Sequence, residues 1–444
     1  MSEIKDRDRA ERHQMKLTIT NVGKVKRAEI RLDGLSVISG PNGSGKSTIS
    51  RVLMTYVTCL RRMDELIRNR RIELFYNELI PLLKLSEMWM RRVWRYVRRS
   101  ENPDEFLMPE NWNSEEKIRK FLLSVCNKIP ANQSFKEQIE TLDIKVDSVL
   151  FALAKVTDMP DQMLAKEILE KSFTDAFGGQ IVPLVGNTGP SRIEISFASS
   201  DQLSHVEFDA TNALTSLSES KHQQIPPVIY IEPIHALDVN PPNGIFPYFT
   251  LGRYHANECD IGSILDNLNY SRTYGDPADE MLVNEVANEL RFIVHGDFEE
   301  HDDHMTFNER FSETVSGFVE LMNMASGSKT ISVLVHALRN GALRRKSIVV
   351  IDEPEANLHP EWQVRFARAL VVMRKRLELG MLINSHSPYF IKAIEHYADQ
   401  EGVSDVGYYL MGKQGDDILF TADDCQGETN KIFETMYQPF KEIM

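Results

Sequence analysis

One stretch decides the fold of this 444-residue chain: GPNGSGKS, residues 40–47. It matches the pattern G-x-x-x-x-G-K-[ST] in full, follows the apolar run Leu35–Ser39 and opens a helix-like segment at 47–60. Glycines at this spacing let backbone N–H groups turn inward around phosphate oxygens, and a helix N-terminus adds a favourable partial charge. A chance glycine-rich turn would lack this strand-to-helix context. The stretch therefore predicts a phosphate-binding loop (P-loop) for ATP.

Each residue of the loop has an expected role. The cradle is formed by Gly40, Pro41, Asn42, Gly43, Ser44, Gly45, Lys46, Ser47 and Thr48. Lys46 would reach the β and γ phosphates, and Ser47 would hold Mg²⁺.

An acidic pair and a histidine supply the remaining chemistry. The strand-like run SIVVIDEP (347–354) contains Asp352-Glu353, and the next apolar run ends in His386. Asp352 would contact the Mg²⁺ shell, and Glu353 would polarise the attacking water. His386 would sense the γ-phosphate or orient that water. Alone, these could be surface carboxylates and a solvated histidine, but beside a P-loop they predict a Mg²⁺-dependent ATPase in which Glu353 and His386 are catalytic.

A second phosphate-sized loop lies at NMASGSKT, residues 323–330, and again precedes a helix-like segment. Taken alone, small polar residues before a helix are usually an N-cap. One nucleotide needs one such loop, however, so a second indicates a nucleotide held between two bodies.

The order GPNGSGKS, ASGSK, VVIDEP, NSH resembles that of ABC-type ATPases of the chromosome-maintenance and DNA-repair kind. It is most similar to compact bacterial AAA-type ATPases related to the overcoming-lysogenisation-defect nucleases, which occur in phage-defence systems. The sequence EPEANLHP after the strand is characteristic of that group. The resemblance covers residues 15–60 and about 226–444.

The resemblance implies that the signature loop closes over ATP bound to another subunit. Ser326 and Gly327 would contact the γ-phosphate in trans, and Lys329 would add a phosphate contact. Two ATP molecules would then lie in a two-fold interface, so we expect a homodimer or a higher homo-oligomer. Residues 357–359 would sense the partner site.

The resemblance also has gaps. The related nucleases carry a Toprim domain, whereas 58 residues follow His386 here. We therefore expect no nuclease activity in this chain and a separately encoded effector, possibly a nuclease. The HDDH stretch at 301–304 has residue types that could bind a metal, but a solvated hairpin tip is the favoured interpretation. The lid-loop glutamine of the family has three unranked candidates: Gln180, Gln223 and Gln224.

The expected fold is α/β, a P-loop NTPase of ABC-ATPase type with a mixed sheet flanked by helices. Residues 1–60 and 226–444 would form the ATPase head, and residues 61–225 an inserted helical lobe followed by strands. No apolar run is long enough to span a membrane, and the charged N-terminus does not resemble a signal peptide, so a cytoplasmic protein is expected. The four cysteines form no CxxC pair.

Charge leaves a second function open. The net charge is −14, yet Arg51 to Arg99 contains twelve Lys/Arg and five Asp/Glu, a local balance of +7. The stretch MWMRRVWRYVRRS (88–100) interleaves arginines with aromatic residues. It could bind nucleic acid, dock an acidic protein or be a solvated helix face. The first hypothesis is thus an ATPase that regulates an effector in antiviral defence, and the alternative is a DNA repair or chromosome-maintenance ATPase.

Overall fold

The computed structural model describes residues 15–84, 93, 102–128, 133–186, 189–196, 203–218, 225–231, 277–290, 294, 296–301, 304–310, 312, 314–320, 323–339 and 341–441. The described chain forms two compact units. The first combines residues up to Arg61 with those from Glu170 onward, and the second comprises Arg62–Leu169. The basic stretch 88–100, apart from Val93, lies outside the described residues.

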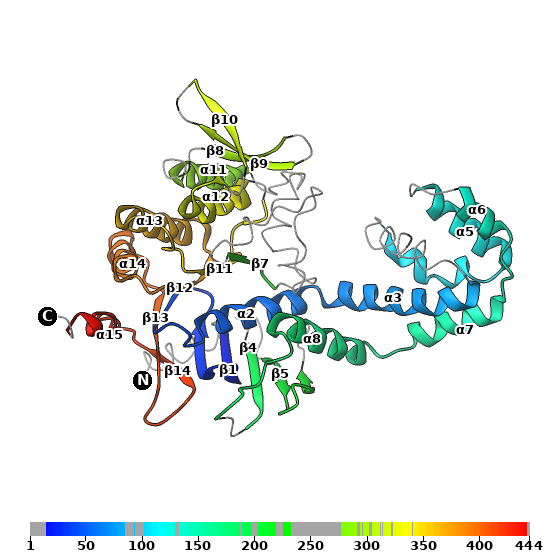
Figure 1. Cartoon of the computed structure of the whole chain (residues 1–444), viewed down its shortest axis with the longest axis horizontal. Coiled ribbons are helices and arrows are strands. Elements are labelled where there is room, and N and C mark those ends of the chain that lie inside the picture. Colours follow the sequence, from blue (N-terminus) through cyan, green and yellow to red (C-terminus); the bar gives the residue numbers. More distant parts are fainter. Residues whose placement is uncertain are drawn as a thin grey trace. The chain divides into compact units, whose positions relative to one another are not determined.

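The first unit is built on a mixed sheet of eleven strands (Figure 1). In spatial order these are β6 (Leu214–Ser218), β5 (Leu203–Phe208), β4 (Ser191–Ser196), β1 (Lys16–Val22), β2 (Val25–Arg31), β14 (Phe420–Asp424), β13 (Val406–Gly412), β3 (Leu35–Ser39), β12 (Gly380–Asn384), β11 (Ile348–Asp352) and β7 (Val228–Ile231).

The five strands from β13 to β7 run parallel, so their carboxyl ends meet at one edge of the sheet. Every residue of β3, β11 and β12 is buried, as expected for parallel strands covered on both faces. The P-loop follows β3, His386 follows the adjacent strand β12, and the acidic pair lies at the end of β11, the next strand beyond β12. The predicted mixed α/β architecture is confirmed.

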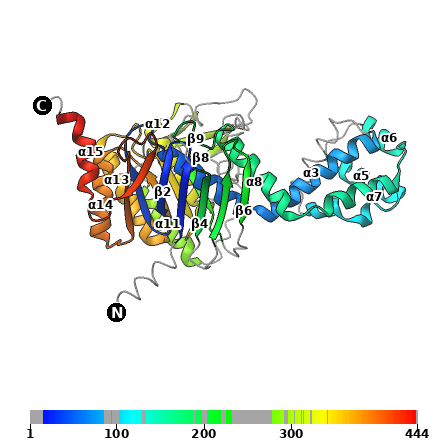
Figure 2. The same ribbon diagram turned by 90° about the horizontal axis from the view of Figure 1, so that it is seen from below.

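Helices cover both faces of these parallel strands. One face packs against α11 (Pro277–Leu290), α12 (Ser326–Arg339), α13 (Pro360–Leu377) and α14 (Pro388–Glu401), which gather on one side of β11–β13 in Figure 1. Helix α2 (Lys46–Arg61) contacts β7, β11 and β12, and it covers the other face. Helix α15 (Asn430–Lys441) lies beside α14 (Figure 2).

Local sequence explains where α14 begins and ends. Ser387 accepts a hydrogen bond from Phe390 N, and Pro388 occupies the first helical turn, where its missing N–H costs nothing. Gly402 ends the helix in the left-handed region, at φ +68°. The start of α14 is therefore set directly after His386.

A small antiparallel sheet, β8 (Gly296–His301), β9 (His304–Arg310) and β10 (Ser316–Glu320), contacts α12. The HDDH stretch lies at the β8–β9 turn, with residues 302–303 outside the described ones. Phe298 of β8 packs edge to face on His336, and Asp297 pairs with Arg339, both partners being on α12.

The second unit is helical. It contains α3 (Met63–Leu83), two short 3₁₀ segments (Pro103–Leu107 and Pro109–Asn111), α5 (Glu115–Asn127), α6 (Gln133–Glu140), α7 (Val146–Thr157) and the first part of α8 (Asp161–Phe177). Its core surrounds Trp112, whose ring contacts Phe75, Phe106 and Phe121. Figure 2 shows α3 alongside α5, α6 and α7.

The boundary after the helical unit lies earlier than the sequence grouping 61–225 implies. Strand β4 pairs antiparallel with β1, with Ile193 opposite Ile19, so β4–β6 extend the main sheet. Short alternating strands can pair with each other or with a distant strand, and the sequence pattern does not distinguish the two.

Candidate functional site

The glycines of the P-loop occupy backbone positions that other residues would strain. Gly40, Gly43 and Gly45 have φ of +143°, +70° and +100°. A Cβ at Gly40 would lie 2.7 Å from Met411 Cβ, and one at Gly45 would lie 2.8 Å from Val25 Cγ2. The loop is therefore enclosed by β13 and β2, and its conformation requires these glycines.

Lys46 lies inside this loop and is 6% exposed. Its Nζ donates hydrogen bonds to the carbonyl oxygens of Gly40 and Pro41, at 2.8 and 2.9 Å. Burial lowers the pKa of Lys46, while the nearby carboxylates of Glu353, Asp352 and Glu355 oppose that shift. The lysine and the acidic residues are thus brought into one electrostatic site.

The other loop residues line an open cradle. Pro41, Asn42, Gly43 and Ser47 are exposed, and Thr48 is partly buried. The buried Ser44 hydroxyl has no hydrogen-bond partner, and the first N–H groups of α2 have no intrahelical acceptor. Unpaired donors around a glycine loop suit phosphate oxygens, so these residues fit the predicted ATP.

Asp352 ends β11, is 3% exposed and accepts three hydrogen bonds. Ser50 Oγ and Asn384 Nδ2 donate to Oδ1 at 2.8 and 2.5 Å, and Tyr230 OH donates to Oδ2 at 3.0 Å. Ser50 stands one turn after Ser47 on α2, so Ser47 and Asp352 lie at neighbouring positions. This arrangement suits an Mg²⁺ ion bound by Ser47 and substrate phosphates, with Asp352 in its outer shell.

Three partners of Asp352 were missed from the sequence. Tyr230 lies within the apolar strand β7, Asn384 ends β12 and Ser50 lies on α2. The only sequence signal is a polar residue in an otherwise apolar strand. Nothing in the sequence assigns these three to one carboxylate.

Glu353 and His386 meet across neighbouring strand ends. His386 Nε2 donates a hydrogen bond to Glu353 Oε1 at 2.8 Å, and Glu353 N donates to Asn384 O at 2.8 Å. Glu353 has φ +49°, the left-handed region that is uncommon for a non-glycine residue. Both side chains remain partly exposed. The structure thus brings the two predicted catalytic residues together.

The predicted signature loop opens α12. Ser328 donates hydrogen bonds from N and Oγ to Ala325 O, which forms the first turn. A Cβ at Gly327 would lie 2.6 Å from Asn357 O and 2.8 Å from Leu358 Cδ2. The first turn of α12, which begins at Ser326, therefore packs against the segment after Glu353 at Gly327.

Lys329, the third predicted residue of the signature loop, lies inside its own chain. It is 2% exposed, among the most buried large side chains of the described chain. A contact with a partner's phosphate would require this side chain to move, and that contact stays a prediction. A lysine side chain has a long apolar stem, so at this helix position it can pack inside the chain or extend into solvent. The sequence does not distinguish these two placements.

Gln180 alone of the three lid-loop candidates lies within the described residues. It is exposed in the turn after α8, next to Ile181, whose carbonyl accepts a hydrogen bond from Gly23 N. A Cβ at Gly23 would lie 3.2 Å from Thr48 Cγ2. Gln180 therefore directly precedes Ile181, the residue bonded to Gly23, and Gly23 borders the end of the P-loop.

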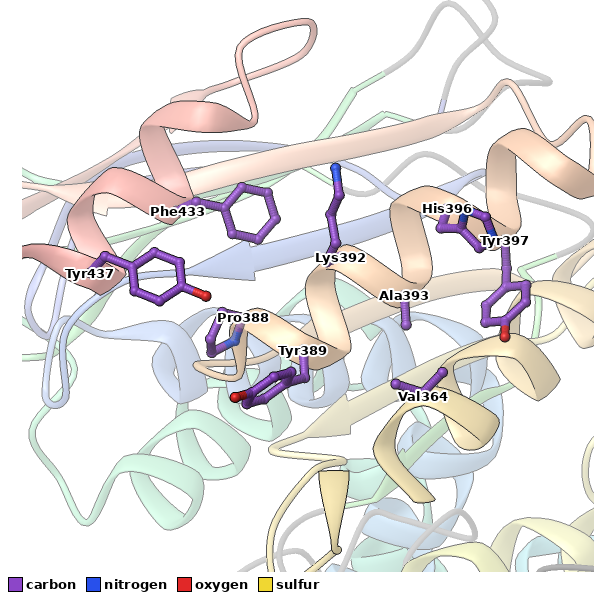
Figure 3. Close-up of a pocket in the computed structure, with 9 residues that line it drawn as sticks. All are labelled: Val364, Pro388, Tyr389, Lys392, Ala393, His396, Tyr397, Phe433 and Tyr437. Atoms are coloured by element: carbon purple, nitrogen blue, oxygen red, sulfur yellow. The ribbon is translucent and has the colours of Figure 1, made fainter. Parts of the chain in front are cut away.

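Other candidate sites received no support. Within the described ranges, no three His, Cys, Asp or Glu side chains gather as metal ligands. Among the same residues, no helix has the length and apolar character needed to cross a bilayer. A surface hollow of about 500 Å³ is lined by α13, α14 and α15 and by aromatic rings including Tyr389 and Phe433 (Figure 3). It contains none of the predicted site residues.

Two stretches of the chain match models of AAA domains. Residues 263–392 match a family described as "AAA domain, putative AbiEii toxin, Type IV TA system", and residues 16–54 match a second one described as "AAA domain". These stretches contain the P-loop, Asp352, Glu353 and His386. Over them, the chain is similar to AAA-domain ATPases. Among curated proteins, none matches the chain.

Solved structures similar to the chain include heads of SMC proteins. The SMC head domain from Thermotoga maritima has 11% identity and a TM-score of 0.37, covering 93% of this chain and 98% of that one. An SmcHead bound to the C-winged helix domain of ScpA has 10% identity and a TM-score of 0.41, covering 93% and 97%. An Smc head with an extended coiled coil, from Pyrococcus furiosus and bound to the C-terminal domain of ScpA, has 9% identity and a TM-score of 0.33, covering 95% and 98%. Because these TM-scores are all below 0.5, the fold of this chain is argued from its own sheet topology and its P-loop.

Proposed function

We propose that this chain is an ATPase that binds ATP and Mg²⁺ at Gly40–Thr48 and hydrolyses ATP with Glu353 and His386. The observation that carries the proposal is the 2.8 Å hydrogen bond between His386 and Glu353. It lies at the carboxyl ends of β11 and β12, and β12 is the strand next to β3, which enters the P-loop. A base, a histidine and a phosphate cradle are thereby grouped at one sheet edge.

The roles follow from position and chemistry. Lys46 would neutralise phosphate charge, and Ser47 with Asp352 would hold Mg²⁺, which polarises the phosphates when bound. Glu353 would accept a proton from the attacking water, and His386 would hold that carboxylate in place. The partly exposed Glu353 leaves room for a water beside it.

ATP-dependent dimerisation is the second part of the proposal. It is supported by a second helix N-terminus, that of α12, with Ser326-Gly327 in its first turn. In a two-fold dimer this turn would face the partner's γ-phosphate, and each subunit would complete the other's site. The chain would then act as a sensor or scaffold for a separate effector in antiviral defence, as the toxin–antitoxin description of the matched family suggests.

The test is the native mass of Glu353→Gln protein purified from its host with and without ATP and Mg²⁺, together with the identity of what co-purifies. We expect an ATP-dependent dimer or larger assembly carrying a second protein. A monomer under both conditions would overturn the dimer. Absence of ATP turnover in the wild-type chain with Mg²⁺ would overturn the ATPase itself.

Nucleic-acid binding, the alternative, has less support from the described residues. Arg62, Arg70 and Arg71 of the helical unit form ion pairs with Glu65, Glu73 and Asp161, which neutralise part of the basic charge. An assembly that carries only nucleic acid in the same purification would favour this alternative.

A further inference from the structure

Glu355, two residues after the proposed base, is the acceptor on which the turn carrying His386 converges. Its Oε1 accepts hydrogen bonds from Ser385 Oγ at 2.9 Å, His386 N at 2.6 Å and Ser387 N at 3.0 Å. Every residue of the turn from β12 to α14 is therefore bound to one carboxylate oxygen.

His386 is held from two sides by the same short segment. Glu355 binds its backbone N–H, and Glu353 binds its ring Nε2. The segment is itself a tight turn, because Ala356 N donates to Glu353 O at 2.9 Å and Leu358 N donates to Glu355 O at 3.1 Å. The two carboxylates thus keep a fixed spacing, and the histidine is fixed between them.

Three donors converge on one carboxylate oxygen of Glu355. Hydrogen bonds to a carboxylate are shorter and stronger than those to a neutral acceptor. The second oxygen, Oε2, is buried without a hydrogen-bond partner. Lys46 lies close enough to Glu355 that the carboxylate opposes the fall in the lysine's pKa.

We propose that Glu355 is a positioning residue, which holds the 385–387 turn so that His386 stays on Glu353. This inference rests on the proposed ATPase function. Glu355 acts through His386 and contacts no reacting atom. Its loss would displace His386 and slow hydrolysis while leaving the P-loop intact.

The experiment measures kcat and the Kd for ATP, with Mg²⁺, in Glu355→Ala and Glu355→Gln. The control is Glu361→Ala, which removes an exposed carboxylate of α13 that pairs with Arg365. Glu355→Ala should lower kcat by up to about 100-fold, the scale of a small misplacement of a catalytic group. The Kd for ATP should not rise, because removing a negative charge near the phosphates does not weaken their binding. Glu355→Gln keeps one acceptor oxygen and should recover part of kcat, and the control should match wild type.

A second set of variants, made in His386→Ala protein, distinguishes a positioning role of Glu355 from a general role in the stability of the fold. In His386→Ala protein, Glu355→Ala should cause no further loss of kcat, since the two residues act as a unit. Three results would overturn the inference: an additive loss of kcat in the double variant, a higher Kd for ATP in Glu355→Ala, or an unchanged kcat in Glu355→Ala. If Glu355→Ala does not fold, Glu355→Gln in the same two backgrounds distinguishes the same outcomes. A wild-type chain that binds and hydrolyses no ATP would count against the ATPase proposal instead.

Discussion

At the scale of single residues, Lys46 is held in place before any ligand arrives. Its hydrogen bonds to Gly40 O and Pro41 O fix the ammonium within the loop. A flexible lysine would lose side-chain entropy on binding phosphate, and a fixed one has lost much of it during folding. The carboxylates of Glu353 and Asp352 offset the cost of burying the charge.

We expect Lys46→Ala to abolish measurable ATP binding, because it removes the buried cation that faces the phosphates. Isothermal titration with ATP and Mg²⁺ checks this. The matched control is Lys26→Ala on β2, whose lysine pairs with Asp417 at 2.6 Å. Unchanged ATP affinity in Lys46→Ala would remove this lysine from the site.

Glu353→Gln should keep the Kd for ATP and lower kcat by about 100- to 10,000-fold, the range of a lost general base. The amide can still accept from His386 but takes up no proton. Single-turnover and steady-state assays separate binding from chemistry. Full turnover in this variant would show that another group activates the water, and His386→Ala then becomes the informative comparison.

At the scale of elements, much of the fold follows from patterns of apolar residues. The helix expected at 47–60 lies within α2, the strand-like run 347–354 contains β11, and the apolar run that ends in His386 contains β12. The order of the strands in the sheet does not follow from such patterns. Strand β3 lies between β12 and β13, from the other end of the chain, and such long-range pairing leaves no local pattern.

The candidate site shows the same division. The sequence predicts the P-loop motif, Asp352, Glu353 and His386, because each follows a strand or opens a helix. It does not predict the residues that hold Asp352 in place, because these come from other strands. Tyr230 donates a hydrogen bond to Asp352 from β7, and Asn384 donates one from β12. Glu355 had a visible signal, a third carboxylate in DEPE, but its acceptor role appears only when the 385–387 turn is placed beside it.

Gly327→Ala tests the contact between α12 and the segment after Glu353. A Cβ there would lie 2.6 Å from Asn357 O, so the first turn of α12 or residues 357–358 must shift. We expect ATP binding by the monomer to persist and ATP-dependent dimerisation to weaken, as read by light scattering. Gly412→Ala is the control, because its nearest neighbour, Asp423 Oδ2, lies at an ordinary 3.8 Å. Equal dimerisation in both variants would separate α12 from the interface.

At the scale of the whole molecule, the chain folds as two units with separate cores. One core covers the parallel strands of the head, and the other surrounds Trp112 in the helical unit. Separate cores predict separate stabilities, because each unit buries its own apolar surface. A change in one core should therefore leave the chemistry of the other intact.

Trp112→Ala tests this independence. Trp112 is 0% exposed, packs on three phenylalanine rings and donates from Nε1 to Phe106 O at 2.9 Å. Its removal should destabilise the helical unit by about 3–5 kcal/mol, the usual cost of a buried aromatic residue. Hydrogen exchange followed by mass spectrometry should show faster exchange across residues 62–169, with exchange and ATP binding unchanged in the head.

The control for Trp112→Ala is Phe151→Ala on α7, since Phe151 is 74% exposed in the same unit and its loss should be nearly silent. If Trp112→Ala also abolished ATP binding by the head, the two units would be one cooperative body. The helical unit would then belong to the ATPase core. If only the helical unit loosened while Glu353→Gln still assembled with ATP, assembly would depend on the head alone, and the helical unit would be free to carry contacts with an effector.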